Sequence, residues 1–138
     1  MRPPLDPYVD LAAARAGGPS PWVQSLDGEW DFRLVDSPEW ADAAVRSLFA
    51  GGVDADVAGR WDTIRVPGSW VLQGGESFRF GRPAYTNVVM PFDADPPNVP
   101  LRNPSGIHRR TFRVPRDWRG RRILLEIGSA DSFLAAWV

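Results

Sequence analysis

The clearest pattern in this chain is Glu29-Trp-Asp-Phe-Arg-Leu-Val35, where apolar and polar side chains alternate. In an extended strand the apolar members share one face: Trp30, Phe32 and Leu34. The polar members share the other face: Glu29, Asp31 and Arg33. Asp27-Gly28 is a turn signal directly before the run. The stretch therefore predicts a strand with one buried face, and it is the starting point for the fold.

A helix is predicted directly after this strand, over residues 38–50. Ser37 is a good N-cap, Pro38 suits the first helical position, and Glu39 complements the helix dipole. An apolar stripe recurs at every fourth residue, and Gly51-Gly52 ends the pattern. We expect the helix to bury the residues of that stripe: Trp40, Ala44 and Leu48.

Strand character returns four times, with proline and glycine between the strands. The predicted strands are residues 61–66, 107–114, 121–127 and 133–138. The glycine-rich segment 73–82 predicts a loop, 83–90 an extended segment, and 91–106 a long loop with five prolines. Loops of that length in small domains are often functional. Short strands with one short helix predict an all-β fold, an antiparallel β-sandwich.

The two ends of the chain differ in character. Residues 1–21 carry five prolines and predict an extended N-terminal arm or a disordered tail, ahead of a domain over residues 22–138. The last residues, 132–138, form an apolar run with no turn residue after it. Such a run is typical of the inside of a sheet, so we expect the domain to be truncated at its C-terminus and the chain to be an N-terminal fragment.

Composition excludes several classes of function. The net charge of −1 does not favour binding to nucleic acid or to acidic membranes. Cysteine is absent, no apolar stretch approaches the length of a membrane span, and the N-terminus has no secretory signal. We therefore expect a cytoplasmic protein with no membrane partner. Seven Trp and seven Phe suit a β-domain core, and aromatic rings can also stack on sugars.

Eight short motifs, in order along the chain, carry a family resemblance. They are Leu26-Asp-Gly-Glu-Trp30, Ile64-Arg-Val-Pro-Gly-Ser-Trp70, Pro83-Ala-Tyr-Thr-Asn-Val-Val-Met-Pro-Phe92, Pro96-Pro-Asn-Val-Pro100, Asn103-Pro-Ser-Gly106, Arg109-Arg-Thr-Phe-Arg-Val-Pro115, Trp118-Arg-Gly-Arg-Arg122 and Ala130-Asp-Ser132. From about residue 22 to 138 the chain resembles the N-terminal domain of β-galactosidases of glycoside hydrolase family 2. Residues 85–104 favour β-galactosidase over β-glucuronidase.

The resemblance implies both a fold and an activity. The fold would be a jelly roll of the galactose-binding type, followed along the chain by an immunoglobulin-like domain and a catalytic (β/α)₈ barrel. The complete enzyme would hydrolyse terminal non-reducing β-D-galactose from β-galactosides as a homo-oligomer. Magnesium and sodium are typical of such enzymes, but no ligand is implied in this stretch. The alternatives are another family 2 activity, such as β-glucuronidase or β-mannosidase, or a free-standing carbohydrate-binding module.

Asn87 is the one substrate-binding residue that the resemblance implies. In the resembling enzymes the Asn of Tyr-Thr-Asn reaches from this domain to the galactosyl group. Its amide offers donors and an acceptor, so it can hold sugar hydroxyls without a charge. The alternative is that Asn87 caps a turn before Pro91.

No catalytic residue or metal ligand is predicted in this chain. The resemblance places both catalytic carboxylates on the downstream barrel, and the four glutamates here are scattered. His108 is predicted to lie on a strand surface, and the seven arginines from Arg109 to Arg122 to form a solvated or interdomain face. Three tryptophans are expected in the core or in domain contacts: Trp70, Trp118 and Trp137.

Overall fold

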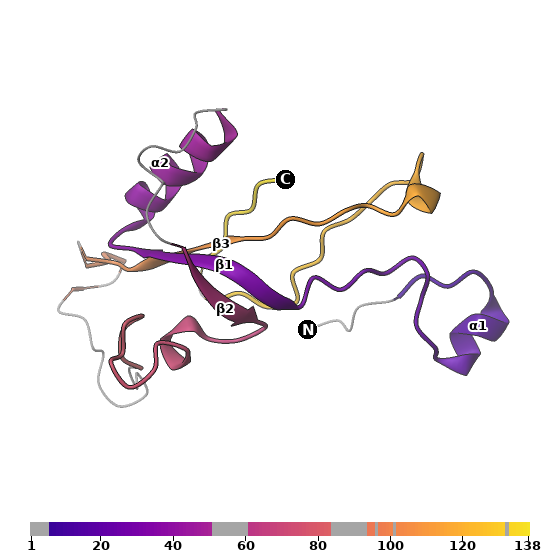
Figure 1. The fold of residues 1–138 in the computed structure, drawn as a ribbon, viewed down its shortest axis with the longest axis horizontal. Helices are drawn as coiled ribbons and strands as arrows, with labels where there is room; N and C mark the ends of the chain where they lie inside the picture. Colours follow the sequence, from indigo (N-terminus) through magenta and orange to yellow (C-terminus); the bar gives the residue numbers. More distant parts are fainter. Residues whose placement is uncertain (1–5, 51–60, 84–93, 96, 101, 132) are drawn as a thin grey trace. The chain divides into compact units, whose positions relative to one another are not determined.

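The computed structural model describes residues 6–50, 61–83, 94–95, 97–100, 102–131 and 133–138, and it divides into two units (Figure 1). One unit is formed by residues 27–111 and carries the β-sheet. The other joins residues 1–26 to residues 112–138. Each unit has its own internal contacts and is described by itself.

The sheet has three antiparallel strands in the order β2-β1-β3. β1 (Gly28–Val35) is central, and it pairs with β2 (Asp62–Val66) on one side and with β3 (Ser105–Arg109) on the other. Across β1 the register sets Phe32 opposite Asp62 and opposite His108. The strands predicted at 29–35 and 61–66 are confirmed. The strand predicted at 107–114 is shorter and starts earlier, because the ladder with β1 begins at Ser105.

One face of the sheet carries an aromatic core. Phe32 is 0% exposed and packs with Ile64 and Phe80, while Trp70 lies partly buried beside them. The rings of Phe32 and Phe80 meet edge to face, with centroids 4.9 Å apart. Burial of a Phe side chain contributes about 1.5–3 kcal/mol, so this cluster anchors the unit. Trp70 opens the 3₁₀ helix η1 (Trp70–Leu72), which covers this face.

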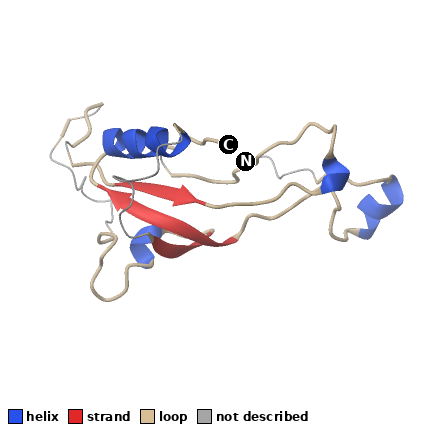
Figure 2. Ribbon diagram, turned by 45° about the horizontal axis from the view of Figure 1, so that its top comes forward, coloured by secondary structure: helices blue, strands red, loops and turns tan. Residues whose placement is uncertain are grey.

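The helix α2 (Pro38–Phe49) lies on the other side of the sheet, against β3 and β1 (Figure 2). Ser37 is its N-cap and Pro38 its first residue, as predicted. The predicted buried stripe is wrong at Trp40, which is 70% exposed, whereas Val45 is buried. The helix packs against β3 and β1 through the face that carries Val45, and this leaves Trp40 on its exposed face.

The second unit contains a helix that the sequence did not predict. α1 (Leu11–Ala16) interrupts the expected extended arm over residues 1–21. The Asp10 carboxylate accepts a hydrogen bond from the backbone N–H of Ala13 at 2.8 Å, and Gly17 ends the helix in the left-handed conformation. Six residues are too few for a clear apolar period, so only the cap could have revealed it.

Two predicted strands are absent from the described structure. Residues 121–127 and 133–138 form no strand, although the first segment sets Ile123, Leu125 and Ile127 on one face and the second is an apolar run. An apolar alternation becomes a strand only where a neighbour pairs with its backbone. The described structure shows a mainly sheet-forming domain with few helices, and none of its helices has the length and apolarity of a membrane span.

Candidate functional site

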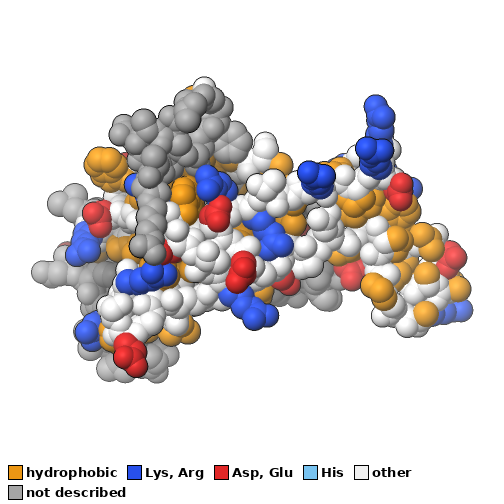
Figure 3. Space-filling view, viewed as in Figure 1, with side chains coloured by type: hydrophobic (Ala, Val, Ile, Leu, Met, Phe, Trp, Pro, Cys, Tyr) orange, Lys and Arg blue, Asp and Glu red, His pale blue; other side chains and the backbone are white. Residues whose placement is uncertain are grey.

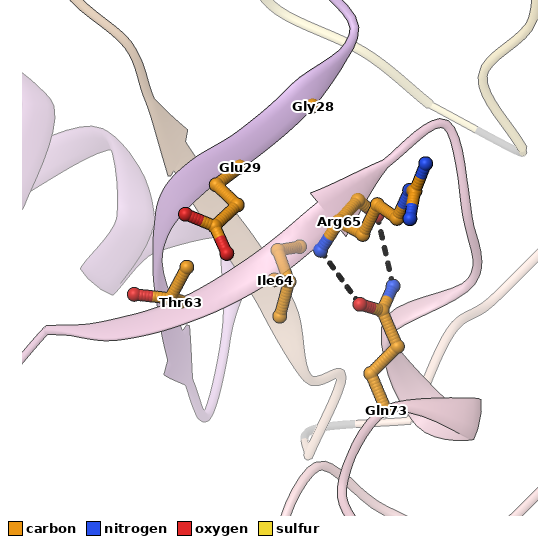
Figure 4. A pocket seen from close by; sticks show the side chains of 6 residues that line it. All are labelled: Gly28, Glu29, Thr63, Ile64, Arg65 and Gln73. Atoms are coloured by element: carbon orange, nitrogen blue, oxygen red, sulfur yellow. Dashed lines mark hydrogen bonds between the residues drawn. The ribbon is translucent and has the colours of Figure 1, made fainter.

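An open groove of about 490 Å³ lies at the β2 side of the sheet (Figure 4). Glu29 of β1 and Thr63 and Arg65 of β2 occupy one sheet face, since Glu29 stands opposite Arg65. Gln73, just after η1, completes the wall. The groove offers hydroxyl, carboxylate and guanidinium groups, a set that suits a hydroxylated ligand. Its single carboxylate, Glu29, is exposed as predicted and has no second carboxylate in the lining.

Gln73 makes two hydrogen bonds to the backbone of one residue. Its Oε1 accepts from the Arg65 N–H at 2.6 Å, and its Nε2 donates to the Arg65 carbonyl at 3.0 Å. Figure 4 shows both bonds as dashed lines. The amide of Gln73 is therefore fixed, and the orientation of this wall of the groove depends on it.

The loop over residues 70–82 is attached to the sheet at three points. Gln73 binds the backbone of Arg65, the Arg79 guanidinium lies 2.9 Å from the Asp62 carboxylate, and Phe80 is buried in the core. The loop predicted at 73–82 is confirmed as a segment without strands. It leads in the chain to Asn87, the one predicted substrate-binding residue, which lies outside the described residues.

An ion pair joins β3 to β1 on the face opposite the aromatic core. Arg109 of β3 stands opposite Asp31 of β1, and its Nη2 lies 3.0 Å from the Asp31 carboxylate. The same guanidinium stacks 4.1 Å above the ring of Trp61, just before β2. Over the described residues drawn in Figure 3, acidic and basic side chains are interspersed. A face with both signs of charge does not favour a polyanion such as nucleic acid.

His108 lies on β3, as predicted, with part of its ring against the core. Its ring centroid is 5.1 Å from that of Phe32 and 6.0 Å from that of Trp70. Burial of the imidazole against these rings lowers its pKa, although a contact with the Gly106 carbonyl opposes the shift. The ring contacts place His108 as a packing group at the edge of the aromatic cluster.

The remaining predicted residues have separate environments. Trp70 belongs to the core, as predicted. In the other unit, the Trp118 indole N–H donates to the Pro21 carbonyl at 3.1 Å, and Arg121 stacks 3.7 Å from the ring of Trp22. Trp137 is 44% exposed and outside the core of the described residues. The arginines from 109 to 122 are mostly exposed, in line with a solvated face.

The comparison with protein families agrees with these motifs. The family described as glycosyl hydrolases family 2, sugar binding domain, matches residues 23–138. The chain belongs to this family. The match covers the whole sheet-bearing unit, residues 23–26 and 112–138 of the other unit, and every motif quoted above, including the one that contains Asn87. The sequence resemblance to glycoside hydrolase family 2 is thereby confirmed.

The relatives of this sugar-binding domain carry the name β-galactosidase. The protein from Arthrobacter sp. (strain B7) is 45% identical over 100 residues, which cover 68% of this chain and 10% of the relative. The one from Pseudoalteromonas haloplanktis is 38% identical over 80% of this chain, and the one from Psychromonas ingrahamii 34% identical over 97%. The chain spans about a tenth of the length of these relatives.

Sequence reasoning missed two residues that shape this domain. Gln73 has no flanking pattern that signals its contact with Arg65. Gly106 belongs to the motif Asn103-Pro-Ser-Gly106, and a Cβ there would lie 2.7 Å from the Phe32 ring. Neither role is visible in the sequence, because both depend on strands that meet only in the fold.

Proposed function

We propose that this chain is the N-terminal, non-catalytic sugar-binding domain of a β-galactosidase. The complete protein would release terminal non-reducing β-D-galactose from β-galactosides, with retention of configuration. The domain would be a jelly-roll sandwich that supports a downstream catalytic barrel and lends Asn87 to the galactosyl subsite. We further propose a cytoplasmic homo-oligomer.

The observation that carries this proposal is that relatives of a chain that matches the sugar-binding family share the name β-galactosidase. The three relatives described above are all named β-galactosidase, and two of them align with 80% or more of this chain. The groove beside β2 supports the statement that the domain is non-catalytic. A retaining glycosidase needs two carboxylates about 5–5.5 Å apart, and the lining of this groove holds only Glu29.

The domain's own residues would act by binding and positioning. The amide of Asn87 would donate to and accept from sugar hydroxyls, and proton transfer would be left to carboxylates elsewhere. Magnesium and sodium, implied by the family resemblance, find no cluster of three metal-binding side chains among the described residues. We therefore assign them no ligand among these residues.

The test is the substrate preference of the complete natural protein. Purified enzyme should hydrolyse a chromogenic β-galactoside far faster than the matching β-glucuronide and β-mannoside. The 138-residue chain alone should give no turnover above buffer with any of the three. A preference for the glucuronide or mannoside would replace the β-galactosidase assignment with another family 2 activity. Turnover by the 138-residue chain would overturn the non-catalytic role.

A further inference from the structure

The outer edge of β2 is a place where another strand could add. Among the residues that the structure describes, β2 is the last strand in the order β2-β1-β3, and only one of its sides pairs with another described strand. Edge strands present backbone N–H and C=O groups that can pair with another chain. Arg65 stands opposite Glu29 of β1, but its backbone N–H and C=O point to the outer edge. Both groups bind the side chain of Gln73 there.

The amide of Gln73 reproduces the bonds that a neighbouring strand would make. A primary amide has the same C=O acceptor and N–H donor as a peptide group. Gln73 accepts from the Arg65 N–H at 2.6 Å and donates to the Arg65 carbonyl at 3.0 Å, which is the reciprocal pair of an antiparallel ladder. A strand that approached Arg65 would have to displace this side chain.

The surroundings of Gln73 hold its amide in this place. A Cβ at Gly68 would lie 2.9 Å from Nε2 of Gln73 and 3.0 Å from the Arg65 carbonyl oxygen, so only glycine leaves the space. The Gln73 N–H donates to the Trp70 carbonyl at 2.9 Å, and Trp70 is packed against the core. The amide is therefore presented by a fixed turn and not by a free loop.

We propose that Gln73 is an edge guard, which closes the outer side of β2 against strand addition by a second copy of this chain. The sequence of β2 favours such self-pairing. Two copies paired antiparallel about Ile64 would set Arg65 of each opposite Thr63 of the other, and Ile64 opposite Ile64. No like charges would then face each other, so charge does not protect this edge. The proposal is independent of the proposed function.

The test combines hydrogen exchange with the oligomeric state of the complete natural protein. In Gln73→Met, which keeps the length of the side chain and loses the amide, the Arg65 amide should exchange about tenfold faster or more. The variant should also form larger species with rising concentration in light scattering. Gly68→Ala, which displaces the amide without changing Gln73, should do the same.

The control is Leu72→Ala, a neighbouring side chain that is 73% exposed and should change neither measurement. Unchanged exchange at Arg65 in Gln73→Met would overturn the edge guard, and so would faster exchange without any growth in size. If the amides of β1 also lose protection from exchange in Gln73→Met, the Gln73→Glu variant becomes the deciding test of the proposal. Its Glu side chain keeps the oxygen that accepts from the Arg65 N–H. Full exposure of Arg65 in Gln73→Glu, with no growth in size, would likewise count against the proposal.

Discussion

At the scale of single residues, Gly106 is the position where the aromatic core leaves no room. A Cβ there would lie 2.7 Å from Phe32 Cε2 and 3.2 Å from atoms of both His108 and Trp70. The Phe32 ring is fully buried and cannot move into solvent. Gly106→Ala should therefore lower the free energy of unfolding by about 1–3 kcal/mol in urea denaturation, the usual cost of overpacking.

Gly128→Ala is the matched control, because a Cβ at Gly128 meets no atom within 4 Å. It should leave stability within about 1 kcal/mol of the parent, or raise it slightly by restricting the unfolded chain. Equal losses in the two variants would mean that the approach of Phe32 to Gly106 does not constrain the core.

His108 predicts a pH dependence of stability. Its folded pKa is lowered from 6.5 because its ring is partly buried against the core. As the pH falls below about 6.5, the unfolded chain takes up a proton that the folded chain resists, so stability decreases toward the folded pKa. Urea melts between pH 7.5 and 5 should show this loss, and His108→Phe should remove that part of it. An identical slope in the variant would assign the loss to other groups.

At the scale of elements, the face that α2 presents to the sheet can be tested directly. Val45 is buried and Trp40 is 70% exposed. Val45→Ala should cost about 1–2 kcal/mol, because it removes buried methyl groups and leaves a cavity. Trp40→Ala should stay within about 0.5 kcal/mol of the parent, as exposed substitutions usually do. A larger loss from Trp40→Ala would restore the helix face predicted from the sequence.

How far the sequence predicts each element depends on where its partners lie. β1 and the start of α2 follow from local signals, namely the alternation around Phe32 and the Ser37-Pro38 pair. The rotation of α2 does not follow from local signals, because packing against the sheet determines that Val45 is buried and Trp40 is exposed. Residues 121–127 set Ile123, Leu125 and Ile127 on one face, yet no described strand pairs with them. The contact of Gln73 with Arg65 also depends on tertiary packing, so no spacing rule reveals it.

At the scale of the whole molecule, the chain corresponds to about a tenth of its relatives. The described part has a central strand, a hydrophobic core on one face of the sheet, and a loop held to the sheet by Gln73, Arg79 and Phe80. That loop precedes the Tyr85-Thr86-Asn87 motif in the chain. The sequence could point to Asn87 only through the motif's spelling, since an isolated Asn has many roles in turns.

The proposed galactosyl contact predicts that Asn87 acts in the complete protein through sugar binding and not through proton transfer. Asn87→Ala would remove one or two hydrogen bonds to sugar hydroxyls, each worth about 0.5–1.5 kcal/mol net, with more lost where a buried partner stays unpaired. We expect kcat/KM for a β-galactoside to fall roughly ten- to a few-hundred-fold. Asn98→Ala, an exposed asparagine of the Pro-rich segment, should leave it unchanged.

The pH profile separates a binding role from a chemical one. The amide of Asn87 does not titrate near neutral pH, so kcat/KM of Asn87→Ala should keep both limbs of its pH dependence at reduced height. Measurements of both variants from pH 5 to 9 check this. Unchanged kcat/KM in Asn87→Ala would mean that Asn87 only caps a turn before Pro91. A shifted limb of the pH profile would mean that Asn87 is coupled to the catalytic carboxylates. A galactosyl contact requires that kcat/KM falls in Asn87→Ala without a shift of either limb of the pH profile. It also requires that kcat/KM does not fall in Asn98→Ala.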